Sequence, residues 1–556
     1  MSAHKYLLPA PVVFPGDEPF WQAAAQGRLM LKHCPQCGRF HHYPRHHCPL
    51  CGHHETHWRE VSGRGKVYSF SIMGHAARPT APAIVELEEG VRLSSVVVDA
   101  DLHALRIDDP VTLRFLPTEQ GQHALAFTTP AAEQARQYTQ AALRSLGSVQ
   151  ENIAQAFQEA AVIGAGNMGV GIALALLGAG LRVLLVDSAA QALAVGLARI
   201  EQGLAKDLER GRLDAASHAA RRALLRTSTS LQDVADADVI IEAVYEDMAL
   251  KQALFAAIDT VAAPHALLAT NTSTLDVGAI AAATRRPGSV LGLHFFNPAN
   301  VMRLIEVVRA PKTSEQALQQ AQALASRLGK VPVIVGICDG FVGNRLMIRR
   351  EREAARLLLE GALPGQIDRV LREFGLPMGT FELQDMAGGI ALTYHARKRA
   401  GQPDWLIEQL FERGRTGQRA GKGYYRYEPG KRAPIVDPEV SALIEQASVV
   451  AGIERRAIND QEICDRLILS MVNEGAKLVE ERIVERASDI DLVWQLGYGW
   501  PDWKGGPMHY AHTLGVNAVL GRLQALRDRH GERFEPADWL VRLAQTGQDM
   551  LPPSHA

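Results

Sequence analysis

The stretch that decides the fold is AVIGAGNMGVGIALALLGAGLRVLLVD, which runs from Ala161 to Asp187. It begins with a short apolar strand, continues through a glycine-rich turn and an apolar helix that stops at Gly180, and closes with a second strand and an acid. In a dinucleotide site, the first glycine permits a tight turn, the second lets the backbone approach a pyrophosphate, and the third lets the helix pack on the strand. The free N–H groups at the start of the helix then face the phosphates. The stretch therefore predicts a Rossmann unit.

The acid that ends this stretch indicates which dinucleotide binds. Asp187 lies 23 residues after Gly164, where a carboxylate can accept hydrogen bonds from a ribose diol and would repel a 2′-phosphate. The sequence therefore favours NAD over NADP. The residues of this stretch that we expect to contact the cofactor are Gly164, Gly166, Asn167, Met168, Gly169 and Asp187.

Composition limits the class of protein. A chain of 556 residues suggests three or four domains, and 47% hydrophobic with 22% charged residues is ordinary for a globular protein. The net charge of −2 provides no general attraction for nucleic acid or anionic membrane. No apolar run is long enough to span a membrane, and the N-terminus has no signal-peptide pattern. We expect a cytoplasmic protein.

Four of the six cysteines form two Cys-x-x-Cys pairs, each followed by a glycine. This spacing is typical of a tetrahedral zinc site, and four thiolates leave no open position for chemistry, so we expect a structural zinc ion. Histidines crowd the same segment and could compete as ligands, but we expect them to be exposed loop residues. The predicted ligands are Cys34, Cys37, Cys48 and Cys51.

From Val61 to about Pro130 the pattern predicts five short strands separated by turns, and a closed barrel would hide their edges. With the ribbon cysteines and the stretch Ser62–Phe70, residues 17–130 resemble the zinc-ribbon and OB-fold proteins associated with acyl-CoA metabolism. The resemblance implies acyl-CoA handling and docking on a thiolase. The alternative is a module that only stabilises the rest of the chain or assists its oligomerisation. Because the strands lack an interleaved basic and aromatic face, we do not expect nucleic-acid binding.

Four polar residues are expected to meet at one edge of the Rossmann sheet, because each follows a strand and ligands bind beyond the carboxyl ends of parallel strands. They are Asp187, Glu246, Ser273 and His294.

The stretch Gly292–Pro298, which contains His294, is similar to a stretch of the L-3-hydroxyacyl-CoA dehydrogenases. The resemblance to this family spans about residues 158–530. The resemblance implies that His294 is the general base and that Glu306, 12 residues later, orients it and stabilises its charged form. It also implies that Ser273 and Asn344 contact the substrate. Further contacts implied by the resemblance are Glu246, Lys251, Ser273, Asn297 and Arg419 for the cofactor, and Arg210 for CoA.

The implied reaction is the reversible, NAD-dependent oxidation of a 3-hydroxyacyl-CoA to a 3-ketoacyl-CoA in fatty-acid and acyl-CoA degradation, including β-oxidation. A separate thiolase, which would consume the 3-ketoacyl-CoA, is the implied partner. Two alternatives stay open: a dehydrogenase of a CoA-free hydroxyacid, and an acyl-CoA-binding scaffold with an inactive catalytic domain.

After Gly340 the chain is helical and duplicated: Asn344-Arg345-Leu346 recurs as Asp465-Arg466-Leu467, and Ile367-Asp368 as Ile490-Asp491. Because Asp465 replaces Asn344, we expect the second copy to be structural. In single-copy relatives this helical domain makes the homodimer contact. A tandem pair can make the same contact within one chain, and the alternative is a chain that forms a homodimer.

We expect an N-terminal helix and zinc ribbon (17–60), a small OB-type β-barrel (61–130), a partly helical linker (131–157), a Rossmann α/β domain (158–339) and two all-α domains (340–430 and 455–545).

Overall fold

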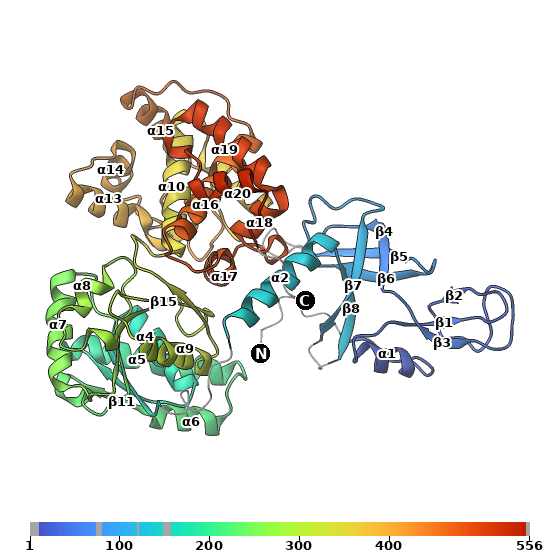
Figure 1. The fold of residues 1–556 in the computed structure, drawn as a ribbon, viewed down its shortest axis with the longest axis horizontal. Coiled ribbons are helices and arrows are strands. Elements are labelled where there is room, and N and C mark those ends of the chain that lie inside the picture. Colours follow the sequence, from blue (N-terminus) through green and yellow to red (C-terminus); the bar gives the residue numbers. More distant parts are fainter. Residues whose placement is uncertain (1–9, 74–79, 119–121, 148–156, 552–556) are drawn as a thin grey trace. The chain divides into compact units, whose positions relative to one another are not determined.

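The computed structural model describes residues 10–73, 80–118, 122–147 and 157–551 (Figure 1). The chain divides into two compact units. The first holds Met1–Tyr138 with the short segments Leu371–Met378 and Pro501–Gly505, and the second holds the remainder. Among the described residues, no helix is both long enough and apolar enough to cross a membrane.

The first unit begins with a short helix and a three-stranded antiparallel sheet in the order β2-β1-β3, followed by the closed barrel β4-β5-β6-β8-β7. The five predicted barrel strands are therefore confirmed. Inward residues such as Val67, Val85 and Phe127 are fully buried and form the barrel core, as the alternating pattern requires. The elements are α1 (Glu18–Ala24), β1 (Met30–His33), β2 (Phe40–His41), β3 (His57–Glu60), β4 (Arg64–Phe70), β5 (Ala81–Leu87), β6 (Arg92–Val97), β7 (Pro110–Pro117) and β8 (His123–Thr128).

Helix α2 (Pro130–Ser145) occupies most of the segment that we expected to be a partly helical linker. The part of that linker from 148 to 156 lies outside the described residues.

The second unit contains an eight-stranded sheet in the order β11-β10-β9-β12-β13-β14-β15-β16. The order reverses at β9, so β10 and β12 flank it and leave a crevice beyond their carboxyl ends, where nucleotides bind in this topology. The strands are β9 (Glu159–Ile163), β10 (Arg182–Val186), β11 (Leu225–Ser228), β12 (Val239–Glu242), β13 (Leu267–Thr270), β14 (Val290–Phe295), β15 (Leu304–Val308) and β16 (Val331–Val335).

Helices cover both faces of this sheet, which explains why its strands are apolar throughout. Along β9, Ala160 and Val162 belong to the core on one face, whereas Ala161 and Ile163 belong to the core on the other. The helices are α4 (Asn167–Gly178), α5 (Ala190–Glu209), α6 (Ala215–Ala223), α7 (Met248–Val261), α8 (Val277–Ala281) and α9 (Glu315–Arg327).

One pair of strands breaks the parallel pattern: β14 and β15 are antiparallel. We predicted that the strand beginning at Val290 would end before His294, but β14 continues through Phe295. The reason is tertiary, because pairing with β15 prolongs the strand and places His294 directly opposite Glu306.

The rest of the second unit is helical, and the duplication inferred from the sequence is visible in how two helices begin. Asp368 accepts hydrogen bonds from two N–H groups in the first turn of α12, at 3.0 Å each, and Asp491 does the same for α18, at 2.7 and 3.0 Å. Gly379 and Gly506 precede these helices, and a Cβ on either would lie 2.2 Å from the carboxylate. Each aspartate thus stabilises the positive end of a helix dipole.

The helices of this region are α10 (Gly343–Glu360), α11 (Pro364–Phe374), α12 (Thr380–Ala387), α13 (Gly389–Ala400), α14 (Trp405–Glu412), α15 (Pro438–Val450), α16 (Asp460–Glu480), α17 (Ala487–Gly497), α18 (Pro507–Leu514), α19 (Val516–His530) and α20 (Asp538–Thr546).

Candidate functional site

His294 and Glu306 form a buried pair across the β14–β15 hairpin. The Nδ1 atom of His294 lies 2.7 Å from Oε2 of Glu306, and the two residues are 7% and 0% exposed. Because a carboxylate can only accept, Nδ1 carries the proton and donates it, which leaves Nε2 free to take a proton from a ligand. The second oxygen of Glu306 accepts a hydrogen bond from the Gly343 N–H group at 3.0 Å, so the carboxylate orientation is held at both ends.

Ser273 lies beside Glu246 in the loops that follow β12 and β13. Glu246 accepts hydrogen bonds from the Thr272 hydroxyl at 2.6 Å and from the Ser273 N–H at 2.9 Å, and its carboxylate lies 3.3 Å from the Lys251 ammonium. Burial opposes the charge on Glu246, but these three donors outweigh it and hold the pKa of the carboxyl below its usual range. A charged carboxylate therefore fixes the loop that presents Ser273.

Glu242, which we did not single out from the sequence, anchors the same network. It is fully buried and accepts from Lys251 Nζ at 2.6 Å, from the Thr270 hydroxyl at 2.6 Å and from the Val244 N–H at 2.7 Å. The last residue of an apolar strand offers no sequence signal for this role. Lys251, expected near the cofactor, is 1% exposed and bridges Glu242 and Glu246.

The glycine-rich turn has the shape that a dinucleotide needs. Gly164 has φ +106°, and a Cβ there would lie 2.6 Å from the Ala243 carbonyl oxygen. A Cβ on Gly169 would lie 1.8 Å from the Gly164 oxygen, so the helix can pack only with glycine at that position. Gly166 instead faces open space and begins α4 without any side-chain cap, which leaves helix N–H groups for a phosphate.

A cavity of about 930 Å³ opens at this turn. It is lined by Gly164, Gly166, Asp187 and Tyr245, among others. The Asp187 carboxylate accepts from the Ala165 and Ala189 N–H groups at 2.9 and 3.0 Å, which holds it at the cavity. These residues fit NAD: they supply a phosphate turn, a carboxylate for a ribose diol and a cavity for the nucleoside.

Of the other predicted cofactor contacts, Asn297 lies at the turn, where Asn167 Nδ2 donates to its Oδ1 at 3.1 Å. Met168 is part of the first turn of α4 and packs against the core beneath it. Arg210 is exposed at the C-terminal end of α5, and Arg419 is exposed on a 3₁₀ turn (Gln418–Ala420) of the first helical copy. None of the hydrogen bonds or ion pairs found among the described residues links either arginine to the glycine-rich turn.

Asn344, the fourth predicted catalytic residue, is joined to the second helical copy. The Tyr498 hydroxyl donates to Asn344 Oδ1 at 2.7 Å. The ring of Tyr498 also packs edge-on against Phe296, with centroids 5.4 Å apart, and Phe296 in turn packs on the His294 ring at 4.6 Å. The second copy, which we expected to be structural, thus contributes one side chain that contacts a residue of the candidate active site.

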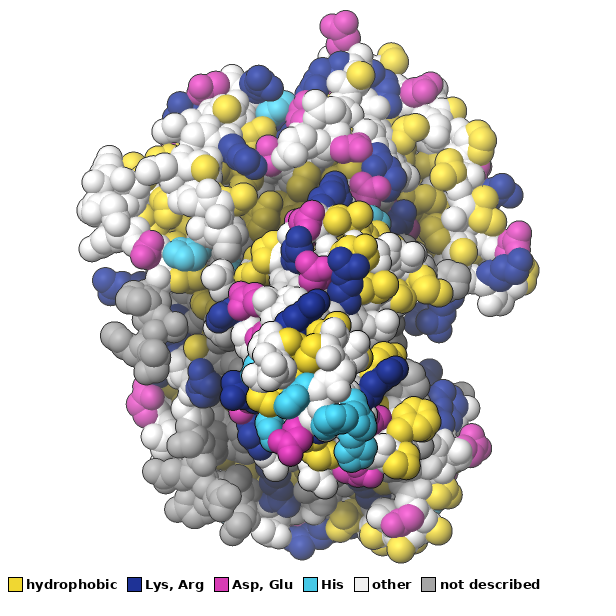
Figure 2. All heavy atoms as spheres, turned by 90° about the vertical axis from the view of Figure 1, so that its right-hand side faces the viewer, with side chains coloured by type: hydrophobic (Ala, Val, Ile, Leu, Met, Phe, Trp, Pro, Cys, Tyr) yellow, Lys and Arg dark blue, Asp and Glu magenta, His cyan; other side chains and the backbone are white. Residues whose placement is uncertain are grey.

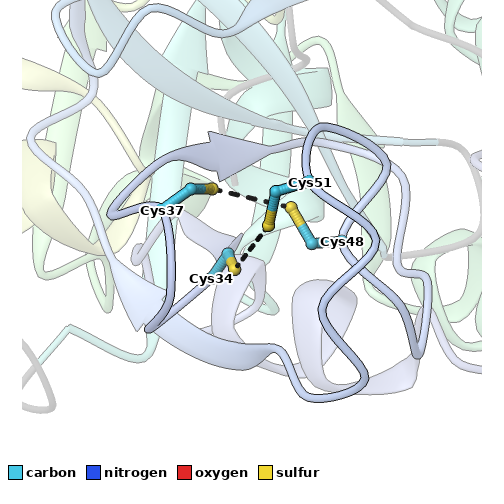
Figure 3. Close-up of side chains that lie close together, drawn as sticks. All are labelled: Cys34, Cys37, Cys48 and Cys51. Atoms are coloured by element: carbon cyan, nitrogen blue, oxygen red, sulfur yellow. Dashed lines mark hydrogen bonds between the residues drawn. The ribbon is translucent and has the colours of Figure 1, made fainter.

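The four ribbon cysteines converge, with all sulfur atoms within 4.8 Å of one another (Figure 3). Cys34 and Cys51 are 3.6 Å apart at sulfur, and Cys37 and Cys48 are 3.7 Å apart. Thiolates at tetrahedral corners around zinc, with bonds of about 2.3 Å, would be separated by about 3.8 Å. The donor set and its spacing fit a structural zinc ion.

Histidines surround this centre without joining it. The metal-ligating group found in the described part of the chain consists of the four cysteines alone. His46, His47, His54 and His57 are exposed, and Figure 2 shows histidine side chains gathered on the face it displays. These four are surface residues, as we expected, but the expectation is wrong for His41, which is buried in β2 with its Nδ1 atom 2.8 Å from the Tyr43 carbonyl oxygen.

Four family models match the chain, over five regions. The model described as "3-hydroxyacyl-CoA dehydrogenase, NAD binding domain" matches residues 159–338, and its "C-terminal domain" counterpart matches twice, at 340–427 and 463–549. At the N-terminus, "ChsH2, rubredoxin-like zinc ribbon domain" matches 21–56, and "ChsH2, C-terminal OB-fold domain" matches 58–116. Both resemblances inferred from the sequence, and the duplication, are confirmed.

Individual relatives agree with these models. The chain is 40% identical to the peroxisomal bifunctional enzyme of Danio rerio over 413 residues, which are 70% of this chain and 56% of that protein. The dehydrogenase part of multifunctional enzyme 1 from C. elegans is 32% identical, with a TM-score of 0.54 over 69% of this chain and 89% of that one. The Escherichia coli 3-hydroxybutyryl-CoA dehydrogenase is 28% identical, with a TM-score of 0.61 over 71% and 100%. The chain thus spans about half the length of the curated relatives it matches.

Proposed function

Because the chain belongs to the 3-hydroxyacyl-CoA dehydrogenase family, we propose that it catalyses the reversible, NAD-dependent oxidation of a 3-hydroxyacyl-CoA to a 3-ketoacyl-CoA in acyl-CoA degradation. The observation that carries this proposal is the buried His294–Glu306 pair, in the same sheet as the glycine turn that fits NAD.

The proposed mechanism assigns each residue one task. Bound NAD supplies the hydride acceptor for the hydrogen on C3 of the substrate. His294 Nε2 takes the proton of the C3 hydroxyl group as the hydride leaves, and the Glu306 carboxylate stabilises the imidazolium that results. Ser273 and Asn344 hold the substrate oxygens. In the reverse direction, His294 returns the proton to the C3 oxygen.

Turnover of acetoacetyl-CoA with NADH tests this proposal, with free acetoacetate as the control. We expect NADH to be consumed with the thioester and not with acetoacetate. The opposite preference would favour a dehydrogenase of a CoA-free hydroxyacid. Binding of acetoacetyl-CoA without any NADH consumption would favour an acyl-CoA-binding scaffold and would refute the proposed reaction.

The role of the N-terminal module is part of the same proposal. Its four thiolates would leave a zinc ion no open coordination position, so we expect no reaction at the metal. We infer that residues 17–130 recruit a thiolase, which would consume the 3-ketoacyl-CoA. Pull-down from the native host with the full chain, and with a variant that lacks residues 1–130, should recover a thiolase only in the first case. Equal recovery in both cases, or no recovery with the full chain, would refute recruitment by this module.

The domain limits, the oligomeric state and the cytoplasmic location stay predictions. The pairing of the two helical copies supports a chain that satisfies its own interface. Arg345 in α10 lies 2.7 Å from Glu474 in α16, and the buried Arg466 in α16 pairs with Glu353 in α10 at 2.5 Å.

A further inference from the structure

The second helical copy reaches the active site through one aromatic side chain. Tyr498 follows the last residue of α17 and donates its hydroxyl hydrogen to Asn344 Oδ1 at 2.7 Å. Its ring stacks on Trp494 of the same copy, with centroids 4.6 Å apart and an interplanar angle of 23°, and meets Phe296 edge-on at 78°. Trp494 is fully buried, so the ring that reaches the site rests on a fixed support.

The chain makes room for this tyrosine at the start of α10. A Cβ on Gly343 would lie 2.2 Å from the Tyr498 ring and 2.5 Å from its hydroxyl oxygen, so only glycine admits the side chain there. The N–H group of the same glycine donates to Glu306 at 3.0 Å. Gly343 thus contacts both the Glu306 carboxylate, which orients His294, and the Tyr498 side chain.

The hydrogen bond determines which atoms of Asn344 remain for a ligand. A tyrosine hydroxyl has one hydrogen to donate, and here it goes to the amide oxygen of Asn344. The bond uses one of the two lone pairs of the amide oxygen and none of the NH₂ hydrogens, so the NH₂ group can donate to a substrate oxygen. Desolvation, with the nearby charges of Glu306 and Glu351, raises the pKa of Tyr498 well above its usual range, so the hydroxyl keeps its hydrogen at working pH.

We propose that Tyr498 is a positioning residue of the dehydrogenase site: it holds Asn344 with its amide N–H groups available to an oxygen of the acyl-CoA substrate. This inference rests on the proposed function, because it names a residue that acts through the same site. It also gives the second copy a role that a purely structural repeat would not have.

Tyr498→Phe removes the hydroxyl and keeps the ring. We expect kcat/KM for acetoacetyl-CoA to fall about 3- to 10-fold, the effect of one lost hydrogen bond. The Kd for NADH should not change, because the glycine turn is untouched. Tyr425→Phe is the matched control: it removes a buried hydroxyl that donates to Asp368 at 2.7 Å, outside the site. Its kcat/KM should stay within about 2-fold of wild type, whatever its melting temperature.

The decisive measurement is a double-mutant cycle with Asn344→Ala. If Tyr498 acts through Asn344, the double variant should be no worse than Asn344→Ala alone, since the partner that Tyr498 orients is already gone. Additive losses would overturn the proposal. So would a Tyr425→Phe variant that loses as much kcat/KM as Tyr498→Phe, because general destabilisation would then explain both.

The same cycle can be read by titrating acetoacetyl-CoA without cofactor. In that readout, Tyr498→Phe and Asn344→Ala should weaken binding without additivity. Absence of NADH consumption by the wild type would refute the proposed reaction, whereas additivity in this titration would refute the role of Tyr498. The two failures are therefore distinguishable.

Discussion

Replacing His294 by glutamine is expected to lower kcat by about 10²–10⁴, the usual contribution of a positioned general acid or base. Glutamine can still donate a hydrogen bond to the Glu306 carboxylate, which now lies 2.7 Å from the imidazole, but it cannot take the proton of the substrate hydroxyl. Binding of NADH should be unchanged, because the cavity at Gly164 and Asp187 has no lining residue from β14. Initial rates with acetoacetyl-CoA and NADH, with NADH affinity measured separately, check both parts.

A matched control is His509→Gln. This histidine is also buried, but it lies in the first turn of α18, where its backbone N–H donates to Asp491. Its replacement should leave kcat within about 2-fold of wild type. If His294→Gln keeps more than about half of the wild-type turnover, the proposed mechanism is wrong.

Removing one zinc ligand, as in Cys34→Ser, is expected to unfold the ribbon (residues 17–60) while dehydrogenase turnover persists. The reason is that a small metal module derives its stability from the ion: apparent binding free energies of about 10–16 kcal/mol have no substitute in a three-stranded sheet. Elemental analysis should find one zinc ion per wild-type chain and much less in the variant. Limited proteolysis of the full-length variant should cleave first within the ribbon.

Cys464→Ser controls for the loss of a thiol, because Cys464 lies in α16, outside the metal-ligating group. It should keep the zinc content and the proteolysis pattern of the wild type. A wild-type chain without zinc, or a Cys34→Ser variant whose ribbon resists protease as well as the wild type does, would contradict the metal site.

Local spacing was enough to predict much of this protein. Three features are local: the Cys-x-x-Cys pairs, the glycine turn with Asp187 and the alternating strands of the barrel. The geometry of each depends on residues that are close in the sequence, so the spacing of those residues predicts it. The four candidate catalytic residues were also named from the sequence, but through its resemblance to a family. From the residues alone, His294 is a polar side chain at the end of an apolar strand, which has many structural explanations.

Only the tertiary structure decided how these residues work together. The antiparallel register of β14 and β15 places His294 opposite Glu306. The residue pattern of a single strand does not show which residues of a neighbouring strand pair with it. Glu242 reads as the end of an apolar strand until Lys251 and Thr270 are seen to bind it. Tyr498 lies 154 residues from Asn344, in a repeat that has Asp465 at the position equivalent to Asn344. Contacts between distant elements depend on how the whole chain packs, and local sequence carries no record of that packing.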